Sequence, residues 1–587
     1  MDGEKDMKKS IICILIFLTV GTLFANPLAK IYQQDDPLIL SLIELSREVG
    51  ILPFSSAGYL TGYDVSQLIE KLESKGVTEK QHQELEQLKA HVLSQYEKIP
   101  ASARIQIAPE MYWNTNDKTK EYEWMVRYNQ RSPFASAETD ALFAQNIYAL
   151  FSYGLKPRLN AEDFNQFNTN SPYRDGFKES QLQNSFPHKA FIGVSSPNFS
   201  LVFGRGLLKY AQGNTGNLML GDHVPYYDFL QASASNTYLR YTFLTIPMNE
   251  IDEEGHAKVP DEKYGLFDSL FNESYVRMFI SHRLEFFLPK IRISLTEGVL
   301  FYTSRADLRM FNPMMFIHNY QNFGEVNNST TLEVEASLIK GLSLDFQLFL
   351  DQIQTKGELS GGAEGVPPNA YAALLALNHT YRSTKGTLNS YIEGVYTSPY
   401  AYLRTGDETE NYYKKVKKEV VVGHDNDNDD KPIRETVYVY EKIDEDKQHN
   451  LDLIHATNMR YGRGGISILG YEYGPDTIVA ATGVRYKDQR GFVLSGDLMG
   501  IIQGNNGLKI ESKSQKVKTD ASEMYRLSPT TPTTYRFVTT LKASYEPPLI
   551  KGLTVLLRTD LVNTWYQGSY SFDSQFNVGL KYQLILF

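Results

Sequence analysis

The chain has 587 residues, of which 42% are hydrophobic and 22% charged, and its formal net charge is −10. Its mean hydropathy is −0.35. No apolar run of about 18 residues follows residue 26, which excludes a protein with several transmembrane helices. The acidic balance argues against nucleic acid as a partner, because nucleic-acid binders carry a basic surface. The single cysteine, Cys13, lies in a segment that we expect to be removed, so the mature chain would have no disulfide framework and no thiolate metal site.

The first 25 residues have the pattern of a secretory signal peptide. Lys8 and Lys9 form a short basic region, the apolar stretch IICILIFLTVGTLF follows, and the small residue Ala25 comes directly after it. This order is typical of a signal that is cleaved during export. We therefore predict a signal peptide over residues 1–25 and an exported mature chain.

Residues 26–100 are predicted to form a small helical unit. Asp36 provides a capping side chain before a proline at the first helical position, and Gly50 ends that helix. A second helix is expected to start near Asp64, and a third starts at Thr78 with capping-box spacing. Three short helices with one apolar face each would pack against something larger, so we expect an interaction or plug domain without an active site.

From residue 101 onward the hydrophobic period changes from 3.6 to 2. The segment STTLEVEASLIKGLSLDFQLFLDQ alternates on both sides of a Lys340-Gly341 turn, which predicts a β-hairpin. Its polar phase contains one apolar exception, Phe349. Its apolar phase comprises Leu332, Val334, Ala336, Leu338, Leu342, Leu344, Phe346, Leu348 and Leu350.

Three features favour a transmembrane β-barrel over a soluble β-sandwich. The strands reach the ~9–11 residues that cross a bilayer at a tilt, the alternation continues to the C-terminus, and an exported chain without cysteine fits a bacterial envelope. We predict an all-β fold, an antiparallel barrel of about 18 strands over residues 101–587 in the bacterial outer membrane, with the helical unit in the periplasm. At this width side chains cannot fill the lumen, so a plug or inward-folded loops are expected.

The last segment, FNVGLKYQLILF, alternates as well and ends on Phe587. A terminal aromatic residue on an amphipathic strand resembles the signal that outer-membrane barrels present to their assembly machinery. The expected partners are therefore outer-membrane lipid and that machinery.

Several segments together resemble a known family. LSREVGILPFSS and GYDVSQLIEKL precede the barrel, a strand then runs into the glycine-rich segment VFGRGLLKYAQGNTGNLMLGDHVPYYDFL, and ISLTEGVLF and GLSLDFQLFLDQ follow. Over most of residues 35–360 this pattern resembles the Wzi family of capsule-assembly outer-membrane proteins. The resemblance implies an outer-membrane barrel that carries a helical bundle and holds a surface glycan, of the lipopolysaccharide type or another polysaccharide.

No enzyme or metal motif stands out. The sequence has no Gly-x-Ser-x-Gly, His-Glu-x-x-His or Walker-type loop, and its eleven histidines have no metal-ligand spacing. The run DNDNDD at 425–430 starts like an EF-hand loop, but Asp430 stands at the glycine position and Thr436 at that of the bidentate glutamate. We expect its alternating flanks to form a solvated β-hairpin above the membrane. We predict no cofactor, no metal and no enzymatic activity.

Glu297 falls on the apolar phase of its strand, which is costly in lipid. We expect a strand end or a bulge at this residue.

The polar phases of neighbouring strands carry charges that would face the lumen. Basic residues gather on one set of strands and acidic residues on the next hairpin. In a water-filled pore they would orient polar solutes, whereas in an occluded lumen they would form ion pairs. The predicted lumen charges are Arg240, Arg277, Arg283, Arg292, Glu333, Glu335, Asp345 and Asp351.

The glycine-rich segment supplies the candidate ligand site. Sugar rings stack on aromatic side chains and accept fixed polar contacts, although the same residues could also pack as a loop inside the barrel. The candidate ligand-binding residues are Arg205, Tyr210, Asp222, His223, Tyr226 and Tyr227.

Two function classes remain open from the sequence. One is a Wzi-like barrel that binds or attaches surface polysaccharide without catalysis. The other is a diffusion porin or substrate-specific channel for small polar solutes.

Overall fold

The computed structural model describes a large part of the chain. The described residues are 26–94, 100–115, 131–143, 145–157, 169–170, 182–183, 189–224, 226–248, 276–303, 311–312, 325–353, 368–405, 413–425, 431–442, 450–455, 458–461, 465–506, 515–518 and 526–586. The predicted signal peptide and Phe587 lie outside them. None of the described helices is long and apolar enough to span a membrane.

The helical unit consists of α2 (Pro37–Val49), α3 (Gly62–Glu73) and α4 (Glu79–Ser94). They follow a 3-10 turn, η1 (Pro27–Ala29), and a two-stranded sheet of β1 (Ile31–Tyr32) and β2 (Leu60–Thr61). The ends of α2 are those predicted: the Asp36 carboxylate accepts a hydrogen bond from the Leu38 N–H, and Gly50 adopts a left-handed conformation with φ of 82°. The second helix starts earlier than expected, because Thr61 is the N-cap and Asp64 is the third helical residue of a capping box.

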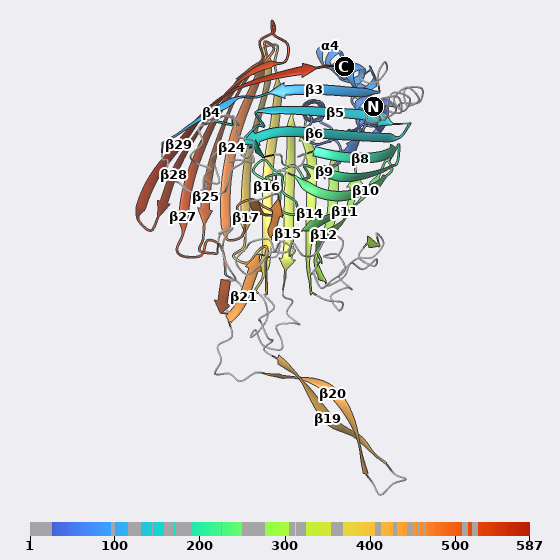
Figure 1. Cartoon of the computed structure of the whole chain (residues 1–587), viewed down its shortest axis with the longest axis vertical. Helices are drawn as coiled ribbons and strands as arrows, with labels where there is room; N and C mark the ends of the chain where they lie inside the picture. Colours follow the sequence, from blue (N-terminus) through green and yellow to red (C-terminus); the bar gives the residue numbers. More distant parts are fainter. Residues whose placement is uncertain are drawn as a thin grey trace, which may run out of the picture.

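Most of the strands after the helical unit form a closed antiparallel barrel (Figure 1). β3 and β4 both pair with β29, and β7 and β8 both pair with β6, so each pair counts as one interrupted strand. The barrel therefore has 18 strands, as predicted. Its segments are β3 (Ala101–Ile107), β4 (Glu110–Asn114), β5 (Ala135–Phe143), β6 (Ile147–Pro157), β7 (Leu182–Gln183), β8 (Lys189–Ser196), β9 (Phe199–Gly206), β10 (Tyr227–Ser235), β11 (Leu239–Met248), β12 (Val276–Phe287), β13 (Ile291–Thr303), β14 (Glu325–Ile339), β15 (Leu342–Gln352), β16 (Ala370–Arg382), β17 (Gly386–Thr397), β24 (Thr477–Asp488), β25 (Phe492–Gln503), β27 (Thr534–Tyr545), β28 (Leu553–Tyr566) and β29 (Ser569–Ile585).

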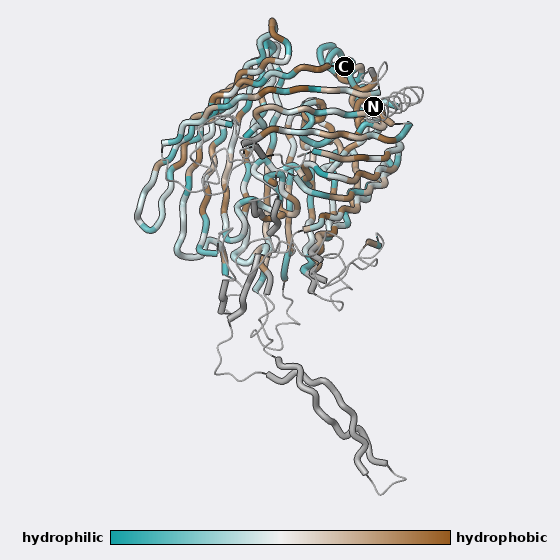
Figure 2. The backbone as a smooth tube through the Cα atoms, viewed as in Figure 1, coloured by the Kyte–Doolittle hydropathy of each residue, from teal (hydrophilic) through white to brown (hydrophobic). Residues whose placement is uncertain are grey.

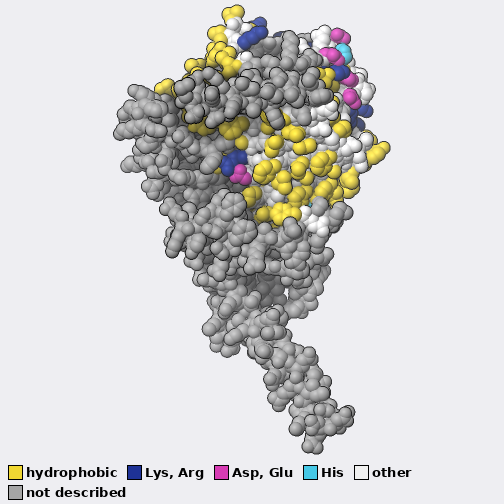
Figure 3. All heavy atoms as spheres, turned by 45° about the vertical axis from the view of Figure 1, so that its right-hand side comes forward, with side chains coloured by type: hydrophobic (Ala, Val, Ile, Leu, Met, Phe, Trp, Pro, Cys, Tyr) yellow, Lys and Arg dark blue, Asp and Glu magenta, His cyan; other side chains and the backbone are white. Residues whose placement is uncertain are grey.

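The predicted alternation decides which side chains face the lumen. In β15, Ser343, Asp345 and Gln347 are buried inside, whereas the apolar phase is only half-buried and faces outward. Figure 2 shows the same alternation of hydrophilic and hydrophobic residues along neighbouring strands. Figure 3 shows apolar side chains gathered on the described outer surface, where an outward-facing band would meet lipid.

The helical unit lies at the end of the barrel where short turns such as Lys340-Gly341 join the strands. The Gly341 N–H donates to the Arg47 carbonyl of α2 at 2.8 Å, and Arg382 at the end of β16 pairs with Glu48 of the same helix at 2.7 Å. Figure 1 shows the helices at this end of the molecule.

At the opposite end, the connection between β17 and β24 extends away from the barrel (Figure 1). It contains the hairpin of β19 (Tyr413–Asp425) and β20 (Lys431–Lys442), which confirms the hairpin predicted around residues 425–430. Smaller sheets accompany it. They are formed by β18 (Leu403–Thr405), β21 (Asn450–His455) and β26 (Gln515–Lys518), and by β22 (Asn458–Tyr461) and β23 (Gly465–Ile468).

Candidate functional site

The linker between α2 and α3 enters the lumen and pairs with the glycine-rich loop between β9 and β10. The Gly58 N–H donates to the Lys209 carbonyl at 3.1 Å, and the Ala211 N–H donates to the Ser56 carbonyl at 3.0 Å. Gly58 has φ of 55°, and a Cβ on it would lie 1.9 Å from Oε1 of Gln231 in β10. Only glycine permits this close approach of linker and wall.

The glycine-rich loop, residues 207–224, lies across the lumen and is held by two side chains of the wall. The Glu393 carboxylate of β17 accepts the backbone N–H groups of Asn214 and Thr215 at 2.6 and 2.8 Å. Gln347 of β15 accepts the Leu218 N–H at 3.0 Å, and its own amide donates to Asn217 at 3.1 Å. Inward polar residues thus satisfy the loop backbone that water would otherwise have to solvate.

Two further segments, residues 398–403 and 468–476, complete the lumen plug. The Tyr402 hydroxyl donates to the Leu218 carbonyl at 2.9 Å, and the Gly221 N–H donates to the Leu469 carbonyl at 2.9 Å. Phe349, the apolar exception on the polar phase, faces inward and lies 4.9 Å from the Tyr402 ring. Loop and wall residues therefore share one buried apolar cluster inside the barrel.

The predicted lumen charges form a buried ion-pair network instead of the walls of a water-filled pore. Arg283 is bidentate to Glu333 at 2.6 and 2.7 Å and lies 3.6 Å from Glu285. Arg292 pairs with Glu335 and lies 3.8 Å from the same Glu285. Both arginine side chains are fully buried.

The helical unit supplies further ligands to this network. The Ser55 hydroxyl donates to Glu285, Arg283 donates to the Ser56 hydroxyl at 2.9 Å, and Arg292 donates to the Phe54 carbonyl. The network therefore joins the plug to the wall, and the linker cannot leave the lumen without leaving buried charges unsatisfied.

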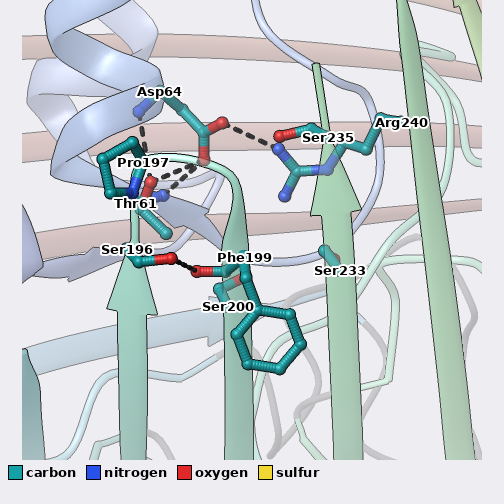
Figure 4. Close-up of a pocket in the computed structure, with 9 residues that line it drawn as sticks. All are labelled: Thr61, Asp64, Ser196, Pro197, Phe199, Ser200, Ser233, Ser235 and Arg240. Carbon is teal, nitrogen blue, oxygen red and sulfur yellow. Dashed lines mark hydrogen bonds and ion pairs between the residues drawn. The ribbon is translucent and has the colours of Figure 1, made fainter.

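Arg240 joins the helical unit to the wall separately, at the mouth of the barrel. It pairs with Asp64 of α3 at 2.8 Å, and Asp64 also completes the capping box with Thr61. Figure 4 shows this pair above a small recess of about 10 Å³ between α3 and the ends of β8–β11, which is space for about one water molecule.

The remaining predicted lumen charges have different surroundings. Asp345 is buried and accepts a hydrogen bond from Asn378 at 2.7 Å, whereas Asp351 accepts the Tyr402 N–H at 2.8 Å. Arg277 lies in β12, and its side chain is outside the described part of the structure.

The six candidate ligand residues do not lie together. Tyr210 and Tyr227 are buried inside the barrel: the Tyr210 hydroxyl lies 2.9 Å from that of Ser281, and the Tyr227 hydroxyl donates to Gly221 at 2.9 Å. Burial raises the pKa of Tyr210, so its hydroxyl stays neutral. In the loop, Asp222 lies 3.9 Å from Lys209, and His223 bonds to the Ile468 carbonyl at 2.9 Å.

Arg205 and Tyr226 instead lie at the outer face of the wall. Arg205 shares the strand phase of Phe203, which is 64% exposed, and its register partner is Asp228. The guanidinium is bidentate to Asp228, with both contacts at 2.7 Å, and lies 4.3 Å from the centre of the Tyr226 ring. The alternation of side chains in β9 could have placed Arg205 on the outer face. The prediction instead assigned it to the ligand site together with the rest of the glycine-rich segment.

The expectation of a strand end or bulge at Glu297 is wrong. Glu297 lies within β13 in unbroken register and faces outward, between His282 and Thr330. It accepts a hydrogen bond from Asn328 at 3.0 Å, and His282 Nδ1 lies 2.7 Å from the Tyr241 hydroxyl.

This part of the outer wall is covered by protein. The outward-facing Ile280 and Val299 are fully buried, His282 is 5% exposed, and Phe311 from the β13–β14 connection packs against the same apolar cluster. Polar side chains persist on this face because protein covers it.

Three residues that anchor the plug were not singled out from the sequence: Glu285, Gln347 and Glu393. Each lies on the inward phase of its strand, so the alternation locates the side chain. Their hydrogen-bond partners belong to the linker and the loop, and only the tertiary structure brings those partners together.

Comparison with known proteins bears on the fold. No family model matches the sequence, and no curated protein matches it. Among solved structures, Wzi of Escherichia coli aligns with a TM-score of 0.54 and 12% identity, covering 94% of this chain and 98% of that one. Wzi is described as an outer membrane protein involved in group 1 capsule assembly and as a carbohydrate binding β-barrel.

Porin-like barrels align less closely. OccAB4 of Acinetobacter baumannii has a TM-score of 0.39 at 10% identity, and OccK10 of Pseudomonas aeruginosa has a TM-score of 0.38 at 10% identity. Each alignment covers 83% of this chain, with 98% of the former and 100% of the latter. The resemblance predicted from the sequence thus holds at the level of the fold: the chain has the architecture of an outer-membrane β-barrel similar to Wzi.

Proposed function

We propose that this protein is an outer-membrane barrel that binds or attaches surface polysaccharide and performs no catalysis. The observation that supports this proposal over an open diffusion pore is the lumen plug. The linker, the glycine-rich loop and the two inward segments share one apolar cluster with the wall, and the ion pairs beneath it are buried. A filled lumen gives a solute no wide aqueous path.

The proposed orientation follows from the loops. Bacterial barrels have short turns in the periplasm and long connections outside. The helical unit at the short-turn end would then lie in the periplasm, and the β19–β20 hairpin would stand on the cell surface. The last strand, β29, would carry the signal for the assembly machinery, and lipid and surface glycan would be the partners outside.

Planar-bilayer conductance tests the plug against the channel alternative. The unmodified protein is expected to be nearly silent. Replacing residues 212–219 by a short Gly-Ser linker removes the loop from its Glu393 and Gln347 anchors and should open a pore. A matched variant that shortens the β19–β20 hairpin should stay silent. A large steady conductance in the unmodified protein would favour the porin.

Retention of polysaccharide on cells tests the binding role. Cells that produce the protein should keep added or native surface polysaccharide, and cells that lack it should release it into the medium. A cell surface that holds polysaccharide equally well without the protein would contradict the proposal.

A further inference from the structure

One sector of the lumen wall is not sealed by the plug. The arginines of the buried network are fully buried. The inward side chains of Arg485 in β24 and Lys542 in β27 are 45% and 47% exposed, and that of Arg558 in β28 is 26% exposed. Water therefore reaches the inner wall along β24–β28, although the helical unit lies at the short-turn end of the barrel, near Arg485.

The three cations lie in one register row that crosses four neighbouring strands. Arg485 is the register partner of Ser495 in β25, Ser495 is the partner of Lys542, and Lys542 is the partner of Arg558. Adjacent strands are about 4.8 Å apart, so this basic arc, Arg485–Lys542–Arg558, spans about 14 Å along the wall. That width exceeds a single phosphate or carboxylate group.

Each cation of the basic arc has a carboxylate partner that is less exposed than itself. Glu44 of α2 lies 2.6 Å from Arg485 and is 19% exposed, Asp497 lies 3.8 Å from Lys542 and is 31% exposed, and Asp560 lies 2.8 Å from Arg558 and is buried. The cations therefore stand closer to solvent than the groups that neutralise them.

Two more lysines on the inward phase lie between the basic arc and the short-turn end. They are Lys487 in β24 and Lys581 in β29, whose register partner is Thr554. Neither has an ion-pair partner among the described residues. The sector also holds Glu110 of β4, the register partner of Gly579, and its neighbour Arg131, so six cations oppose four carboxylates and the sector keeps a positive charge.

This sector is closed on the side away from the helical unit, whereas Arg485 and Lys487, toward the short-turn end, are exposed to solvent. The next inward row toward the opposite end contains the buried Thr540 and Asp560, and Val538 and Val562 of the lumen cluster lie beyond it. Glu44 of α2 borders the recess at Arg485. The sector is thus a blind basic recess and not a channel through the barrel.

We propose that this recess binds an extended polyanion, a chain carrying two or more carboxylate or phosphate groups, that enters from the short-turn end. Guanidinium and ammonium groups donate charge-assisted hydrogen bonds to such groups, and rows of them line protein sites for anions. This proposal does not require the glycan role proposed above. The recess lies toward the short-turn end, whereas the long connections proposed to face the cell exterior lie at the opposite end of the barrel.

Binding by the purified full-length protein in detergent tests the proposal. The probes are an oligogalacturonate and tripolyphosphate, with a neutral maltooligosaccharide as control, measured by calorimetry at low and high salt. Both polyanions or one of them should bind, the neutral sugar should not, and salt should weaken binding. Preference for one polyanion identifies sugar acid or phosphate as the natural group.

Variants assign the binding to the recess. Lys542→Gln combined with Lys581→Gln should weaken polyanion binding by about tenfold or more, while Lys551→Gln, in the exposed turn before β28, should leave it unchanged. Heat-modified mobility on gels confirms that each variant is folded. Absence of polyanion binding at low salt, or equal binding by the double variant, overturns the proposal.

The reaction rates of a single introduced cysteine measure the local charge independently of binding. Ser495→Cys places a cysteine within the basic arc, and Ser569→Cys places one at the first residue of β29, at the opposite end. An anionic methanethiosulfonate should react faster relative to a cationic one at residue 495 than at residue 569, by about tenfold, and a polyanion should slow it. Equal ratios at the two sites contradict a basic recess.

Discussion

Arg283 shows how strongly a single residue depends on its surroundings in this barrel. Its side chain is fully buried, and its guanidinium is held by Glu333, by Glu285 and by the Ser56 hydroxyl of the linker. Two arginines share three glutamates, so each guanidinium stabilises more than one buried carboxylate, and Glu285 also accepts a hydrogen bond from Ser55. Removing one member therefore leaves a buried charge without its partner.

Arg283→Met is expected to destabilise the barrel by about 3–5 kcal/mol, because Glu333 loses its bidentate partner in the interior. The matched control is Arg485→Met, which removes a half-exposed arginine from Glu44 and should cost about 1 kcal/mol or less. The measurement is the midpoint temperature of heat-modified mobility. Equal midpoints for the two variants would contradict the buried network.

Gly58 offers a second test at the residue scale. Gly58→Ala and Gly76→Ala both place a side chain at positive φ, at 55° and 68°, so both carry a strain of about 1–2 kcal/mol. Only the Gly58 variant also meets Gln231, since a Cβ at Gly76 has nothing within 4 Å.

The Gly58 variant should therefore lose more thermal stability and become more sensitive to protease in the linker. The Gly76 variant serves as the control for backbone strain alone. Similar losses in both would show that the linker does not sit against Gln231 as described.

At the scale of elements, each strand divides the chain between two environments. β28 carries Arg558 and Asp560 inward, where Asp560 is buried, and Leu557 outward, where it is 42% exposed. The same division holds in β15, except that one inward position, Phe349, is apolar. Phe349 is inward because it has Tyr402 to pack against.

Two adjacent leucines of β28 test the division directly. Leu557→Arg places a charge on the outward face and should cost about 2–4 kcal/mol near the bilayer centre. Leu556→Arg points into the partly open sector of the lumen, where the guanidinium can reach water, and should cost much less. Folding yields in lipid vesicles compare the two. Equal yields would contradict the assigned phase of β28.

At the scale of the whole molecule, the two ends of the barrel differ in kind. The short-turn end carries the helical unit and opens the basic recess, whereas the other end carries the long connections and the β19–β20 hairpin (Figure 1). In the proposed orientation, this asymmetry determines which parts a protease outside the cell could reach.

Protease added to intact cells should cleave first within residues 404–449 and spare the helical unit. The hairpin stands away from the barrel, while α2–α4 would be shielded by the membrane. Mass spectrometry of the released peptides gives the cleavage sites, and cells opened by lysozyme and detergent serve as the control. First cleavage in intact cells within residues 64–94 would reverse the proposed orientation.

The barrel could be predicted from the order of the residues alone, because a side-chain period of 2 is a local property of each strand. That order gave the alternating phases of several strands, the number of strands, the ends of α2 and the hairpin around residues 425–430. It also marked Glu297 as unusual, although the cause turned out to be protein that covers the outer wall and not a bulge.

Only the tertiary structure decided what fills the lumen. The linker and loop residues that bond to Glu285, Glu393 and Gln347 lie more than 100 positions away in the chain, so no local pattern could have paired them. The candidate ligand residues come from one segment, residues 205–227, but Arg205 lies outside while Tyr227 lies inside, because a strand sends alternate side chains to opposite faces. Whether an inward charge ends in a dry ion pair, like Arg283, or in a wet recess, like Lys542, depends on where the plug packs, and that is a property of the closed barrel as a whole.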